Sequence, residues 1–157
     1  MKLADFVCLD ALIPRLASTQ RDGAITELVE ALHRAGKLRG SKAADVAKAV
    51  IRRENEASTG IGKGVAVPHV KHPAARDVIA ALGCSDKGIE FASLDKQPVY
   101  TVFLLLSPAD NADKHLQAME AIFQHLNKDD FRRFMRQVQT VEDIKDLILE
   151  ADEAAGN

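Results

Sequence analysis

The sequence is poor in residues that mark several classes of protein. Tryptophan is absent, aromatic residues make up 4% of the 157 positions, and the only cysteines are Cys8 and Cys84. Two cysteines are too few for a disulfide framework or a thiolate zinc site. The longest apolar run, residues 99–106, is eight residues long, whereas a membrane-spanning helix needs about 20. We therefore expect neither a disulfide-stapled protein nor one that inserts into a membrane.

An excess of positive charge is also missing. Lys and Arg number 21 against 23 Asp and Glu, which gives a net charge of −2. Proteins that bind nucleic acid or anionic membranes through bulk charge carry a basic excess. Nucleic acid is therefore not an expected partner.

The length predicts a single domain, since a domain averages about 150 residues. We assign residues 1–157 to this domain, with a core over about 10–150 and an acidic, Ala-rich tail over 150–157. Asp5 and Asp10 interrupt the N-terminal apolar residues, so this stretch does not have the pattern of a signal peptide. A cytoplasmic location is expected.

Apolar spacing predicts two helices in the first third of the chain. The first shows the i, i+3, i+4, i+7 pattern of a buried helix face and ends at Gly36. The residues of this face are Ile25, Leu28, Val29 and Leu32. The second has a similar stripe over 46–51, with Ser41 as its candidate N-cap. Before both, residues 11–16 are predicted to form a short strand, and Pro14 marks it as an edge strand.

The middle third is predicted to be a sheet. Residues 60–68 contain too much glycine and β-branched residue for a helix, and residues 78–83 form a second strand candidate. Residues 86–88, Asp-Lys-Gly, are interpreted as a turn. The run 99–106 is apolar on both faces, which is typical of a central strand.

Three helices are predicted in the last third. Asn111 and Asp129 mark the starts of the first two, and Leu116 and Phe134 are expected to face inward. Thr140, with an acidic residue three positions later, gives the third helix a capping-box start. The resulting order, β-α-α-β-β-β-α-α-α, predicts a three-layer α/β/α sandwich around a small mixed sheet.

Histidine is the residue type most suited to chemistry here. The five histidines are His33, His69, His72, His115 and His125. His33 and His125 lie late in predicted helices, where a structural role is expected. His69 follows a glycine-rich strand and Pro68, which would present its ring at a surface cleft. From the residues alone it is either an acid, base or nucleophile, or a loop histidine bonded to the backbone.

Other kinds of site fit the sequence less well. The glycine-rich segment has neither the P-loop spacing nor the dinucleotide-binding spacing. His69 and His72 lie between Pro68 and Pro73 in a loop, with no Cys or carboxylate at ligand spacing, so no metal site is expected. Cys84 is interpreted as a buried structural cysteine.

The segment Ser58–His69 resembles the active-site signature of a known family. It is similar to the enzyme IIA components of the bacterial phosphoenolpyruvate-dependent sugar phosphotransferase system, of the fructose–mannitol type that includes the nitrogen-regulatory branch. In that family an Arg-Glu pair precedes an STG-x-G-x-G-x-A-x-PH motif. Here Arg53-Glu54 stands 16 residues before His69. The similarity continues, as a pattern, over roughly residues 10–150.

The resemblance implies a set of roles. His69 would be the nucleophile that takes a phosphoryl group from an HPr-like phosphocarrier protein and passes it to a IIB partner. His115 and Arg53 would contact the phosphoryl oxygens, and a guanidinium suits that role because it is a permanently charged fork. Thr59 and the backbone N–H of Gly60 would complete the phosphate pocket. The resemblance implies no metal and no organic cofactor.

Two roles within this family, and others outside it, remain open. One is a transport component that relays phosphate to a sugar permease, and the other is a regulatory phosphoprotein whose phosphorylation state controls target proteins. A non-catalytic binding module with the same fold is a third. The presence of His69, His115 and Arg53 together argues against that third reading, because a binding module has no physical need for all of them. A His/Cys hydrolase using Cys84 fits least.

Overall fold

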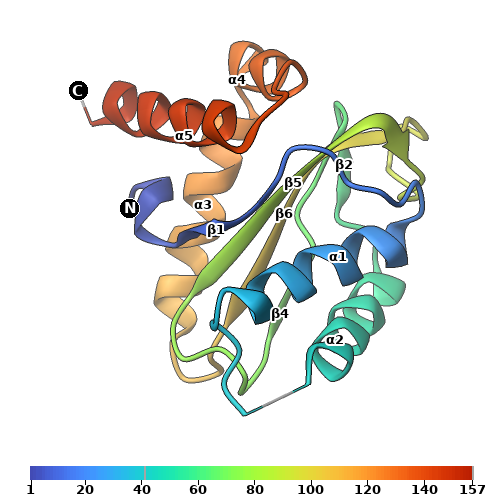
Figure 1. Cartoon of the computed structure of the whole chain (residues 1–157), viewed down its shortest axis with the longest axis vertical. Coiled ribbons are helices and arrows are strands. Elements are labelled where there is room, and N and C mark those ends of the chain that lie inside the picture. Colours follow the sequence, from blue (N-terminus) through green and yellow to red (C-terminus); the bar gives the residue numbers. More distant parts are fainter. Residues whose placement is uncertain (41, 157) are drawn as a thin grey trace.

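A single mixed sheet organises the chain. The computed structural model describes residues 1–40 and 42–156, so the candidate cap Ser41 lies outside the described residues. The elements in chain order are the 3-10 helix η1 (Leu3–Asp5), β1 (Val7–Ile13), α1 (Arg21–Arg34), α2 (Ala43–Glu56), β2 (Gly60–Gly62), β3 (Val65–Ala66), β4 (His69–Lys71), β5 (Ile79–Ile89), β6 (Val99–Ser107), α3 (Ala112–Leu126), α4 (Asp129–Met135) and α5 (Val141–Ala155). Figure 1 shows the sheet running diagonally between the helices.

The sheet has the order β1-β5-β6-β3-β2, and β4 also pairs with β6. Strand β6 is antiparallel to β5 and parallel to β3 and β4. The run 99–106 is therefore the central strand, as its apolar character predicts. Its side chains alternate between two cores, with Leu104 and Leu106 in one and Phe103 and Leu105 in the other.

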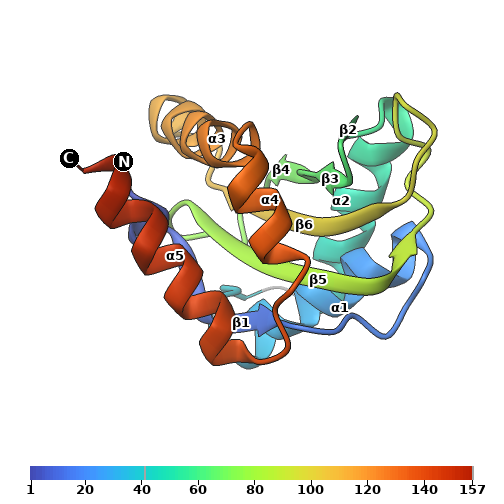
Figure 2. The same ribbon diagram turned by 90° about the horizontal axis from the view of Figure 1, so that it is seen from above.

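Helices cover both faces of the sheet (Figure 2). The residues of α1 and α2 pack in the core that contains Leu104, and those of α3, α4 and α5 pack in the core that contains Phe103. The predicted three-layer sandwich is confirmed. Among the described residues, no helix is both long and apolar enough to cross a bilayer.

Two predicted boundaries are wrong. The first strand spans Val7–Ile13 at the sheet edge, and it ends directly before Pro14 instead of containing it, since proline has no N–H for the ladder. Residues 86–88 lie inside β5, where the pairing register shifts between Cys84 and Ile89. Gly88 has φ +93 there. The residues interpreted as a turn form a bulge, which uses the same glycine conformation.

The inward faces of two helices also differ from the prediction. Leu116 and Phe134 are 59% and 43% exposed, whereas His115, beside Leu116, is buried. The face that α3 turns toward the sheet carries His115, Ala118 and Ile122. The prediction put Leu116 on that face because Leu116 is apolar. The face is occupied instead by His115, a polar residue whose hydrogen-bond partner is buried.

The two ends of the chain are joined. Both oxygens of Asp152, in the last turns of α5, accept backbone N–H groups, from Leu3 at 2.6 Å and from Ala4 at 2.9 Å. Asp152 is buried, although it belongs to the acidic C-terminal segment. At the other end of α5, Thr140 and Asp143 form the predicted capping box.

Candidate active site

His69 is fixed by the backbone around it. It begins β4, opposite Leu105 of β6, and its ring is half-buried. Its Nδ1 lies 2.8 Å from the carbonyl oxygen of Val67. A carbonyl oxygen only accepts hydrogen bonds, so Nδ1 carries the proton of the neutral ring and Nε2 keeps its lone pair. Nε2 is therefore the ring nitrogen whose lone pair is available.

His115 lies beside His69, on the first turn of α3. The two ring centroids are 5.6 Å apart and the ring planes are inclined by 53°. The Nδ1 of His115 is 2.5 Å from the Oγ of Ser107, the fully buried last residue of β6. Burial, followed by the nearby charges of His69 and Lys71, lowers the pKa of His115 below its ordinary value. His115 is thus a neutral ring at pH 7, with one nitrogen held by a serine.

A buried carboxylate organises the segment that leads to His69. Glu54, the 2%-exposed residue near the end of α2, accepts the N–H and the hydroxyl hydrogen of Thr59, both at 2.6 Å. The carbonyl oxygen of Thr59 accepts the N–H of Val67 at 3.3 Å, and Val67 in turn holds the His69 ring. A continuous series of hydrogen bonds thus joins α2 to the imidazole.

The sequence reading assigned Glu54 no role. The signal was present, because this residue belongs to the Arg-Glu pair before the glycine motif. What the sequence could not reveal is that its carboxylate turns inward onto Thr59.

The other residues assigned to a phosphate have different surroundings. Arg53 is partly exposed in the last turn of α2, and its Nη1 donates to the carbonyl oxygen of Ala57 at 3.4 Å. The hydroxyl of Thr59 donates to Glu54, and the N–H of Gly60 donates to Ser58 Oγ at 3.0 Å. The donors of Thr59 and Gly60 are thus engaged within the protein, whereas among the described residues Arg53 makes one long bond.

Gly60 packs too closely against its neighbour to carry a side chain. A Cβ at this position would lie 2.4 Å from Ser93 Oγ, closer than any real contact. The close packing of β2 on the loop after β5 therefore requires glycine here.

The remaining histidines and cysteines do not join this site. His72 Nδ1 accepts the N–H of Ala74 at 3.0 Å, and His125 is buried with its ring centroid 5.5 Å from that of Phe131. Burial lowers the pKa of His125 and raises the pKa of the Cys84 thiol to about 12. Cys84 is therefore no nucleophile at neutral pH. The described residues include no group of three or more His, Cys, Asp or Glu side chains that could hold a metal ion.

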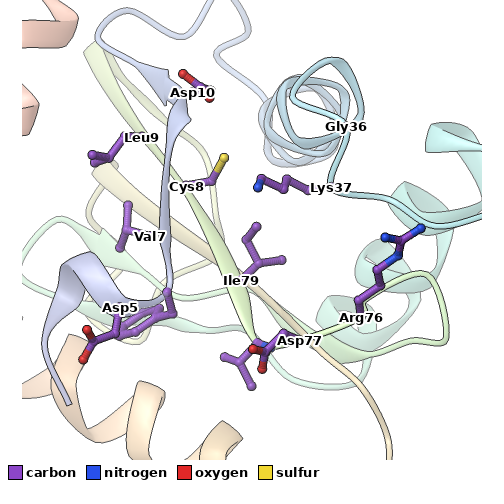
Figure 3. A pocket seen from close by; sticks show the side chains of 12 residues that line it. Asp5, Val7, Cys8, Leu9, Asp10, Gly36, Lys37, Arg76, Asp77 and Ile79 are labelled. Atoms are coloured by element: carbon purple, nitrogen blue, oxygen red, sulfur yellow. The ribbon is translucent and has the colours of Figure 1, made fainter.

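A separate cavity of about 440 Å³ lies at the β1 edge of the sheet (Figure 3). Lys37, Arg76 and Asp77 line its polar side and Cys8 its sheet side. Both oxygens of Asp77 accept from Lys114 at 2.8 Å, which lowers the pKa of Asp77. The lining includes none of the residues that surround His69, so this cavity is distinct from the histidine pair.

Comparison with solved structures identifies the fold. The chain matches the crystal structure of nitrogen regulatory protein IIA-Ntr from Neisseria meningitidis with a TM-score of 0.83 at 23% identity, covering 93% of this chain and 98% of that one. It also matches enzyme IIA mannitol of Escherichia coli, solved in complex with phosphorylated IIB mannitol, with a TM-score of 0.75 at 14% identity. That match covers 90% of this chain and 95% of that chain. The sandwich is the fold of the IIA components.

Sequence comparison identifies the family. The family model described as "Phosphoenolpyruvate-dependent sugar phosphotransferase system, EIIA 2" matches residues 10–151. The chain is 33% identical over 136 residues to the nitrogen regulatory protein of Bradyrhizobium diazoefficiens, covering 87% of each. It is 30% identical over 152 residues to the fructose-specific EIIABC component of Bacillus subtilis, covering 97% of this chain but only 24% of that protein. The chain belongs to the EIIA 2 family, and the resemblance noted in the sequence is confirmed.

Proposed function

We propose that the protein is a phosphoryl carrier that accepts a phosphoryl group on Nε2 of His69. The observation that carries this proposal is the 2.8 Å contact between Nδ1 and the Val67 carbonyl oxygen, which leaves Nε2 as the only free lone pair of the ring. The donor is a phosphohistidine carrier of the HPr type, as family membership suggests. Positioning and charge stabilisation supply most of the catalysis in such in-line transfers.

Transfer to His69 exchanges one phosphorus–nitrogen bond for another. The Nε2 lone pair forms a bond to phosphorus as the phosphorus–nitrogen bond of the donor breaks, and the donor imidazole leaves with that electron pair. The His69 ring gains a positive charge while Nδ1 keeps its proton, so its hydrogen bond to Val67 becomes charge-assisted. That hydrogen bond is stronger after transfer than before it, which stabilises the phosphorylated form.

His115 and Arg53 are assigned to the phosphoryl oxygens. When the Ser107 hydroxyl donates to Nδ1 of His115, the Nε2–H of that ring is available to an oxyanion. The lowered pKa keeps His115 neutral, so it donates without adding a second positive ring beside His69. Arg53 supplies the permanent positive charge. Thr59 and Gly60 contribute their backbone to the wall of the phosphate pocket.

The phosphorylated protein then has two possible uses. One is transfer of the phosphoryl group to a IIB component, because the mannitol IIA relative was solved with its phosphorylated IIB partner. The other is regulation, in which the phosphorylation state of this protein controls a target protein, supported by the 33% identity to the nitrogen regulatory protein of Bradyrhizobium diazoefficiens. A non-catalytic binding module is the alternative if no phosphoryl group is accepted.

The test is phosphorylation in a reconstituted relay. The protein is incubated with phosphoenolpyruvate, enzyme I and HPr, and its intact mass and acid lability are measured. We expect one acid-labile phosphoryl group, lost in His69→Ala and retained in His72→Ala, a matched loop control. No mass gain with an HPr that phosphorylates a known acceptor would contradict the carrier function.

A further inference from the structure

A second polar site lies between α4 and the turn at residues 62–64. Two cavities, of about 450 Å³ and 470 Å³, share the side chains of Lys63, Arg132 and Arg136 in their linings. Tyr100 belongs to the first cavity. Because the two cavities have three lining residues in common, we describe them as one pocket, the Lys63–Arg136 pocket.

The charge of this pocket opposes that of the whole chain. Its ionic lining consists of Lys63, Arg132, Arg133, Arg136, Asp95 and Asp129. The lining is thus cationic, whereas the chain carries a net charge of −2. Concave surfaces lined by one sign of charge concentrate ions of the opposite sign.

Two of the four cations are already paired. Arg132 donates to Asp129 and to the Leu126 carbonyl oxygen, and Arg133 donates to Asp130 at 3.0 Å. Lys63 Nζ and the guanidinium of Arg136 have no hydrogen bond or ion pair among residues 1–40 and 42–156. These two are the cations available to a ligand.

Arg136 is held in a geometry that leaves its donors free. Its Cζ lies over the Tyr100 ring, 3.8 Å from the ring centroid. This cation–π contact engages the charge of the guanidinium and does not require its N–H groups to bond to another residue. Tyr100 therefore holds Arg136 without consuming the fork that binds oxyanions.

Lys63 occupies a backbone position that lysine adopts reluctantly. Its φ is 59, and Gly62 and Gly64 on either side also have positive φ. Asp95 holds the turn by accepting the Lys63 N–H at 3.1 Å and the Gln97 N–H at 3.0 Å. Glycine or asparagine would fit this conformation with less strain. A lysine kept where the backbone disfavours it points to a use for its charge.

We propose that the Lys63–Arg136 pocket binds a phosphate-bearing ligand. An in-plane guanidinium fork and an ammonium group, contributed by two different elements, suit the several oxygens of a phosphate group. The volumes of the two cavities leave room for a diphosphate as well as for a single phosphate. His69, His115 and Arg53 do not line this pocket, so the assignment is independent of the carrier function.

The probe is inorganic pyrophosphate, titrated into the full-length protein at physiological salt and followed by amide NMR signals. We expect saturable shifts at Lys63, Gly64 and Tyr100, weakened as salt is raised. Shifts near His69 report on the histidine site separately, so the failure of one assignment does not imply the failure of the other.

Two variants and a control test the assignment. Lys63→Asn suits the left-handed turn, and Arg136→Met keeps an apolar stem over Tyr100, so both are expected to fold. Each should weaken pyrophosphate binding by about tenfold, the effect of losing one charge-assisted contact. Lys48→Ala, an exposed charge on α2, should bind as the parent does. Unchanged affinity in both variants, no saturable shift, or equal binding of a glutamate-rich peptide without phosphate would overturn the proposal.

Discussion

Replacing Glu54 with glutamine tests whether this buried carboxylate holds the active-site segment in place. The parent carboxylate accepts two hydrogen bonds of 2.6 Å from Thr59, one from its N–H and one from its hydroxyl. Glutamine keeps the shape but offers one acceptor oxygen and an NH₂ group, so one bond becomes neutral and the other must be rearranged. Hydrogen bonds to charged groups contribute about 1.5–3 kcal/mol each, and neutral ones about 1 kcal/mol.

We therefore expect Glu54→Gln to lower the free energy of unfolding by about 2 kcal/mol. For a domain of this length that corresponds to a fall in Tm of about 4–8 °C. The assay is urea unfolding, with the matched control Glu56→Gln, the exposed carboxylate two residues later on the same helix. The control should change stability by less than about 0.5 kcal/mol.

The same variant should also slow phosphoryl transfer to His69. Thr59 anchors Val67, whose carbonyl oxygen holds the imidazole, and a misplaced nucleophile reacts more slowly. Transfer from HPr is measured under single-turnover conditions. A Glu54→Gln protein with the stability and transfer rate of Glu56→Gln would refute the reasoning, because the series of hydrogen bonds would then have no function.

Three further predictions concern the same site. Ser107→Ala removes the partner of the buried His115 Nδ1. It should lower the free energy of unfolding in urea by about 1–3 kcal/mol and slow phosphoryl transfer to His69. If both the stability and the transfer rate were unchanged, Ser107 would have no role in the site. Because the folded-state pKa of His115 is lowered, the unfolded chain binds more protons, so this contribution to stability should be complete above pH of about 6.5 and fall as the pH drops toward the folded pKa. A pKa of His115 above about 6.5, the ordinary value of histidine, would contradict this in an NMR titration. Gly60→Ala would place Cβ 2.4 Å from Ser93 Oγ and should destabilise by about 1–3 kcal/mol, and Ser93→Ala in the same chain should restore part of the loss; no recovery would argue against this contact.

The large elements of the fold could be predicted from the sequence because their signals are local and periodic. The stripe of α1 and the doubly apolar run of β6 both appear in the structure as expected. The bulge at residues 86–88 was mistaken for a turn because a bulge and a turn both use glycine with positive φ. Only the pairing partner distinguishes them, and pairing is not visible in a local window.

The candidate site was predictable only in part. His69 is marked by the glycine motif and Pro68, and His115 is implied by the resemblance to the IIA components, so both could be named from the sequence. The burial of His115 depends on the phase of α3 against the sheet, and the use of Glu54 depends on the fold of the loop after α2. Both are consequences of tertiary packing, which overrides local apolarity.

The most direct test of the account is the position of the phosphoryl group on the His69 ring. The protein is labelled with ¹⁵N on histidine, phosphorylated through HPr, and examined by phosphorus and nitrogen NMR. The 2.8 Å hydrogen bond from Nδ1 to the Val67 carbonyl oxygen predicts phosphorus bonded to Nε2 of His69, with Nδ1 still protonated. Phosphorus on Nδ1, or on any other histidine, would contradict it.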